Sequence, residues 1–354
     1  MFSLFNKNGR PCYFTVIEFF FSACDTESEL TVMCNGKRFR IPLSSDHFED
    51  SPSIKETYLH YLQVAETFEL DGLTVDDLYD WALEPFFLIF RAVPPLLEHH
   101  KPTLQEYLFP ETVGYTLRAV KGELVPFPND QGPSERLPHD VHLDQELCSP
   151  WPSFHPQQVQ LCGDSPEEAL SRCPSKVLVG GKTTCFFKTC HFGDTRRVRE
   201  EIRNYKRIEE AGLAKDLRIS RLHGLVQDDD NGPIYGLLLS YIDCRNKTLA
   251  CAVRPDTPGS LRQQWADQVS HTLKCLHEGG IIWGDVKPDD VLINVNNDAW
   301  IIDFEGGRTE GWMEEKTAGT VEGDLQGLAK ILEYVGIDAS CGVQVDGSES
   351  PHPV

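Results

Sequence analysis

The sequence is poor in basic residues and lacks basic clusters. Lysine and arginine total 33 against 55 aspartates and glutamates, and the formal net charge is −22. Nucleic acids and anionic membrane surfaces attract proteins through patches of positive charge. The charge balance therefore predicts that the protein binds neither nucleic acid nor a membrane.

A long apolar segment is also missing. The run Cys12–Cys24 is interrupted by Glu18, is too short to span a bilayer, and is not followed by a small-residue cleavage site. We expect it to form a buried β-strand. The expected location of the protein is cytoplasmic, with the nucleus left open.

The twelve cysteines form no C-x-x-C pair and no closely set cluster with histidine. This pattern predicts reduced thiols that pack as small apolar side chains and argues against a zinc site. The adjacent His99 and His100 precede Lys101-Pro102, and we interpret them as a solvated helix end and not as a ligand pair.

Residues 1–125 are expected to form a smaller α+β domain. Asn35-Gly36 lies between two strand-like runs, which is a strong hairpin signal. A capping box at Ser53 and Glu56 predicts a helix to about Phe68, and Thr74 to Asp77 predicts the start of another.

Nine prolines fall between Pro126 and Pro174, and residues 126–156 are expected to be an extended connection. Beyond it, strands and helices alternate. The predicted elements are strands in 176–179, 183–188, 218–226 and 233–242, and helices in 194–212, 260–278 and 324–335.

Near the C-terminal end of the sequence, each of two apolar runs is followed by an aspartate. In "WGDVKPDDVLI" it is Asp285, and in "IIDFEGG" it is Asp303. The first stretch resembles the catalytic loop of protein kinases, and the second resembles the strand that ends in their metal-binding D-F-G. The resemblance covers roughly 157–335 and is closest to small kinase-like proteins of filamentous fungi.

This resemblance implies an α+β, two-lobed protein-kinase-like fold with a truncated helical lobe, preceded by the smaller N-terminal domain. The expected N-lobe is 157–240, the C-lobe is 241–336, and a disordered tail is 337–354.

The resemblance also implies roles for individual residues. Asp285 and Lys287 would be catalytic, the first orienting an attacking hydroxyl and the second reaching the γ-phosphate of ATP. Asp303 would hold Mg²⁺, and Asp290 stands where a second metal ligand is expected.

Lys188, at the end of a predicted strand, matches the lysine that contacts the α- and β-phosphates. Glu201, on the following helix, matches the glutamate that pairs with that lysine. Glu200 is the alternative if the helix is rotated by one position.

Several positions depart from the kinase pattern. Trp283 and Gly284 replace His-Arg, so a phosphorylated activation loop has no arginine to receive it. Glu305 replaces the glycine of D-F-G. A glycine-rich loop is missing where it is expected, because 161–173 holds one glycine and several acidic residues.

Two functions follow from these matches and departures. The first is a slow ATP-dependent phosphotransferase whose acceptor the sequence does not identify. The second is a pseudokinase that acts as a nucleotide-binding or scaffold module without turnover. A third interpretation, a soluble α+β protein with purely structural aspartates, leaves the ordered set of charged residues unexplained. The N-terminal domain is the candidate site for a protein partner.

Overall fold

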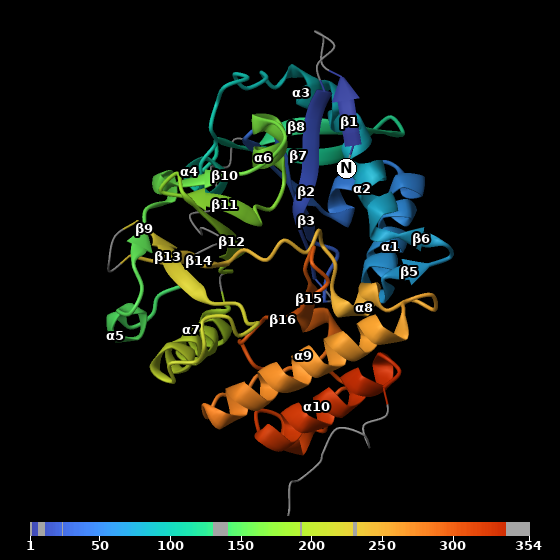
Figure 1. The fold of residues 1–354 in the computed structure, drawn as a ribbon. Helices are drawn as coiled ribbons and strands as arrows, with labels where there is room; N and C mark the ends of the chain where they lie inside the picture. The colour runs from blue at the N-terminus through green and yellow to red at the C-terminus, as the bar shows by residue number, and fades with distance from the viewer. Residues whose placement is uncertain are drawn as a thin grey trace, which may run out of the picture. The chain divides into compact units, whose positions relative to one another are not determined.

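The computed structural model describes residues 2–5, 11–22, 24–129, 141–191, 193–228 and 232–337. The chain forms two units: unit 1 is Met1–Pro138 with Phe154–Phe187, and unit 2 is His139–Ser153 with Lys188–Val354. Both contain helices and strands (Figure 1), which confirms the expected α+β class. Residues 130–140 of the expected connection, and all of the expected tail except Ile337, lie outside the described residues.

A six-stranded sheet is the centre of unit 1, in the order β1-β2-β3-β4-β7-β8. Neighbouring strands are antiparallel except β4 and β7, which are parallel. The strands are β1 (Phe2–Phe5), β2 (Pro11–Phe21), β3 (Ser28–Cys34), β4 (Lys37–Leu43), β7 (Thr112–Val120) and β8 (Glu123–Asn129). Asn35 and Gly36 form the expected tight turn between β3 and β4, with φ angles of 47° and 78°.

Strand β2 begins one residue before the predicted run, ends at Phe21, and is less buried than expected. Phe14 is buried, and its ring lies 4.9 Å from that of Phe90 in the core of unit 1. Phe20 is 59% exposed. A register shift between Val16 and Glu18 interrupts the regular alternation of side chains along β2, so Phe14 and Phe20 lie on opposite faces of the sheet.

The other elements of the N-terminal part cover this sheet and connect its strands. They are α1 (Pro52–Thr67), β5 (Glu69–Leu70), β6 (Leu73–Thr74), α2 (Val75–Leu83), α3 (Phe87–Ala92) and α4 (Leu104–Leu108). The capping box predicted at Ser53 is wrong, because the helix begins at Pro52 with Ser51 as its N-cap. Proline fits the first helical position, where no backbone donor is needed. The box at Thr74 and Asp77 is present.

Residues Phe154–Phe187 also belong to unit 1. They contain β10 (Val159–Leu161), α6 (Pro166–Ser171), β11 (Lys176–Val179) and most of β12 (Thr183–Thr189), and β9 (Ser153–Phe154) lies at their start. Ser171 accepts a hydrogen bond from the Asn35 backbone (3.3 Å) and donates one to the Tyr13 carbonyl (3.1 Å). Helix α6 is thereby fixed to the first sheet.

Unit 2 holds the long helices. Its elements are α5 (Gln145–Cys148), α7 (Thr195–Glu210), β13 (Leu222–Gln227), β14 (Ile234–Ser240), α8 (Leu249–Ala252), α9 (Gly259–Glu278), β15 (Val291–Ile293), β16 (Ala299–Ile301) and α10 (Val321–Tyr334). β13 pairs with β14 and β15 with β16, both antiparallel. The cap predicted at Ser260 is wrong, because α9 follows Pro258 and already includes Ser260.

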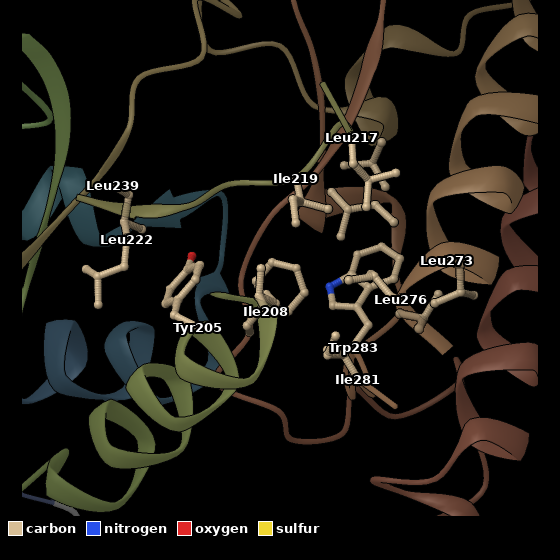
Figure 2. Packing of buried hydrophobic residues seen from close by; sticks show 14 of the residues in the cluster. Tyr205, Ile208, Leu217, Ile219, Leu222, Leu239, Leu273, Leu276, Ile281 and Trp283 are labelled. Atoms are coloured by element: carbon tan, nitrogen blue, oxygen red, sulfur yellow. The ribbon is translucent and has the colours of Figure 1, made fainter. Parts of the chain in front are cut away.

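The core of unit 2 is formed by the apolar faces of its helices, by its strands and by the segment before Asp285. Figure 2 shows labelled side chains of α7, α9 and Ile281–Trp283 in one cluster. Trp283 is fully buried, and its indole donates a hydrogen bond to the Ile302 carbonyl (2.9 Å). In the part of the chain that the structure describes, no helix is long and apolar enough to cross a membrane.

Candidate functional site

Three carboxylates surround the ammonium group of Lys188, near the end of β12. The distances from Nζ are 2.6 Å to Glu305, 3.0 Å to Asp303 and 3.0 Å to Glu201. We call these four residues the Lys188 cluster. The ammonium group donates hydrogen bonds to Asp303 and Glu305 and forms an ion pair with Glu201.

Glu201 is the most buried member of this cluster. It is 1% exposed, and the regular spacing of α7 places it on the same face as Val198 and Tyr205. Burial raises the pKa of Glu201 to about 7, although the Lys188 charge opposes this shift. The expected ion pair between Lys188 and Glu201 is present, whereas Glu200 contacts Arg203 instead.

Lys188 keeps its positive charge in this setting. Its side chain is 28% exposed, and burial alone would lower its pKa. The nearby carboxylates of Glu201, Asp303 and Glu305 outweigh burial, and the pKa of Lys188 is raised. The Lys188 cluster therefore contains one cation among three acidic side chains.

Asp303 follows β16 with a φ angle of 62°, in the left-handed region. This conformation costs a non-glycine residue about 1–3 kcal/mol, so the surroundings must hold it. The next residue, Phe304, is buried, and its carbonyl accepts a hydrogen bond from Asn204 of α7 (2.8 Å). Its ring also packs edge-on against Tyr205. Strain held by such neighbours occurs often at functional sites.

Asp285 is hydrogen-bonded by Thr309 through both of its oxygens. The Thr309 backbone donates to Oδ1 (2.8 Å) and the Thr309 hydroxyl donates to Oδ2 (2.9 Å). Lys287 Nζ contacts the same Oδ2 and lies 3.1 Å from the Thr309 hydroxyl. The carboxylate expected to orient a hydroxyl thus already binds one from its own chain.

Asp290 lies at the same end of the β15–β16 hairpin as Asp303. Val291 pairs with Ile301, and the backbone of Ile302 donates to the Asp290 carbonyl (3.0 Å). Burial raises the pKa of Asp290 to about 7. Lys287 Nζ lies 3.0 Å from Asp290 Oδ2, as an ion pair and not as a well-directed hydrogen bond.

The backbone before Asp285 is anchored by Asp324 of α10. The backbone amides of Trp283 and Gly284 each donate to this carboxylate at 2.8 Å, and His277 contacts it at 2.9 Å. Asp324 is 1% exposed. This carboxylate therefore holds the backbone directly before Asp285 in place.

Gly284 has a structural reason to replace the arginine of the kinase pattern. Its φ angle is 98°, and a Cβ atom there would lie 2.9 Å from the Cα atom of Gly306. The backbone before Asp285 and the backbone after Asp303 therefore meet at two glycines. A side chain at position 284 would force them apart.

The carboxylates suit Mg²⁺ in kind, because this ion prefers hard oxygen ligands. Among the described residues, Glu201, Asp303 and Glu305 have ligand atoms within 4.8 Å of one another. Lys188 Nζ lies within 3.0 Å of all three, so a metal ion at their centre would compete with it. Asp290 lies at the same end of the β15–β16 hairpin as Asp303, and its carboxylate is paired with Lys287 at 3.0 Å.

The region expected to hold a phosphate-binding loop forms a helix instead. Helix α6 occupies Pro166–Ser171, and Ser165 caps it by accepting a hydrogen bond from the Glu168 backbone (3.2 Å). This region belongs to unit 1, and the structure gives it no glycine-rich turn.

Sequence reasoning missed three contributors to the site. Thr309 and Asn204 belong to no recognisable motif, and only the folded chain brings them to Asp285 and Phe304. Glu305 stood out as a departure from D-F-G, but its contact with Lys188 was not expected. The sequence signal that could have predicted this contact was an acidic residue two positions after Asp303.

Comparison of the sequence with protein-family models finds no match, and comparison with curated proteins finds none either. The kinase-like interpretation accordingly depends on the motifs and contacts described above.

Proposed function

We propose that this protein is a slow ATP-dependent phosphotransferase of protein-kinase-like fold with a truncated helical lobe. The observation that carries the proposal is the Lys188 cluster. Lys188, Glu201 and Asp303 come from three separate segments, and both carboxylates lie 3.0 Å from the Lys188 ammonium group, which supports the proposal. Phosphoryl transfer depends mainly on such positioning and on neutralising phosphate charge.

The proposed roles come from the resemblance to kinases, and the contacts support them. Lys188 would contact nucleotide phosphates, with Glu201 holding its side chain in place. Asp303 and Asp290 would hold Mg²⁺, which supplies charge neutralisation when bound. Asp285 would orient the acceptor hydroxyl, and Lys287, in contact with both Asp285 and Asp290, would face the transferred phosphate. The acceptor would be held by the N-terminal part or by a protein partner.

Slow turnover follows from two contacts. Glu305 accepts a hydrogen bond from the Lys188 ammonium, and Thr309 donates one to each oxygen of Asp285. A phosphate would therefore compete with Glu305 for Lys188, and an acceptor hydroxyl would share the Asp285 carboxylate with Thr309. The same contacts favour the second candidate, a pseudokinase that binds nucleotide or a partner without turnover.

The test is ADP formation from Mg-ATP by the full chain, with the Asp285→Asn variant alongside. Slow ADP formation that falls at least about tenfold in this variant supports the phosphotransferase. Rates well below the ~1–100 per second of typical kinases are expected. Asp289→Asn is the matched control, because Asp289 is exposed in the same turn and its substitution should leave the rate unchanged.

If the parent chain binds Mg-ATP but forms ADP no faster than Asp285→Asn, the pseudokinase is the better description.

A further inference from the structure

Glu305 makes the shortest contact in the Lys188 cluster, at 2.6 Å from Nζ. With Asp303 and Glu201 at 3.0 Å, it surrounds the ammonium group with three carboxylate oxygens. A phosphate oxygen can reach Lys188 only if one carboxylate withdraws. Which of the three withdraws decides what the site can bind.

Glu305 is the carboxylate best placed to withdraw. Glu201 is buried on a helix, and moving it would leave an unpaired charge in the interior. Asp303 is held in a strained conformation directly before the anchored Phe304. The Glu305 side chain is 21% exposed, and Gly306 and Gly307 follow it with φ angles of 71° and 124°.

We propose that Glu305 competes with phosphate groups for Lys188 and selects phosphates that arrive with a divalent cation. This inference rests on the proposed function. A metal-free polyphosphate meets three carboxylates around one ammonium group, and like charges repel. A cation-loaded polyphosphate gives the Glu305 carboxylate another positive partner, so Glu305 can leave Lys188 without losing its counter-charge.

The experiment compares the full-length parent with Glu305→Gln, which keeps the size of the side chain and removes its charge. Calorimetric titrations use Mg-ATP in one series and ATP with EDTA in the other. We expect the variant to bind metal-free ATP at least about tenfold more tightly, equivalent to about 1.4 kcal/mol. The gain for Mg-ATP should be smaller, so the ratio of the two affinities falls.

Two further variants complete the experiment. Glu333→Gln makes the same charge change at an exposed position of α10 and should leave both affinities unchanged. Glu305→Gly removes the side chain altogether and should reproduce the effect of Glu305→Gln, which covers the case in which the glutamine variant folds poorly.

Equal affinities of the parent and both Glu305 variants for metal-free ATP would overturn this inference and leave the proposed function standing. If no protein binds ATP under either condition, the proposed function fails, and the inference fails with it.

Discussion

Lys188 and Glu201 depend on each other for their charge states. Glu201 is buried and its pKa is raised to about 7, so its ionised form relies on the nearby ammonium group. Lys188 has two further carboxylates within reach, whereas Lys188 is the one cation recorded within 4.0 Å of Glu201 among the described residues. Loss of the lysine should therefore harm the fold more than loss of an exposed ion pair, which contributes about 0–1 kcal/mol.

We expect Lys188→Met to lower the free energy of unfolding by about 3 kcal/mol, because it leaves a buried carboxylate without its partner. Adding Glu201→Gln should recover part of this loss. Chemical denaturation at neutral pH measures both effects. Lys182→Met, at an exposed turn, is the control and should change stability by less than about 0.5 kcal/mol. A loss of the same small size in Lys188→Met would show that the ion pair contributes nothing to the fold.

At the scale of elements, α10 fixes the segment that carries Asp285. Asp324 lies in its first turn and accepts hydrogen bonds from two consecutive backbone amides, those of Trp283 and Gly284. An asparagine has one carbonyl oxygen, and its amide group would face a backbone donor. The helix therefore needs a carboxylate at this position.

The Asp324→Asn variant should be less stable than the parent by about 2–3 kcal/mol, because hydrogen bonds to a charged group are lost in a buried place. Thermal or chemical unfolding of the full chain tests this. Glu322→Gln, exposed in the same turn, serves as the control. Equal stability of the Asp324 variant and the parent would mean that other contacts hold the Trp283–Asp285 backbone.

Most elements could be predicted from local patterns, because a helix stripe or a hairpin turn is encoded within a few residues. Helix α7 and the Asn35-Gly36 turn are examples. The starts of α1 and α9 were misplaced, because a proline before each predicted cap sets the first turn. The contacts of Thr309 and Glu305 could not be predicted, because they depend on how distant segments pack.

At the scale of the whole molecule, the domain boundary expected from the sequence differs from the boundary that the contacts define. The sequence assigns 157–187 to the kinase-like part, but the contacts group Phe154–Phe187 with the N-terminal sheet. Leu170 packs against Gly36, and Ser171 is hydrogen-bonded to the Asn35 and Tyr13 backbones. A chain that begins near Gln157 would lose these partners. Experiments on the site therefore need the full chain.

The most direct measurement is the thermal stability of the full chain with and without Mg-ATP. Nucleotide at about a hundred times its dissociation constant adds about 2.7 kcal/mol to the free energy of unfolding, and this raises the midpoint measurably. Asp303→Asn should lose most of the shift, since asparagine tolerates the left-handed backbone but lacks the charge. Asp289→Asn should keep it. A parent chain without any shift, or an equal shift in Asp303→Asn, would contradict a metal-dependent nucleotide site at Asp303.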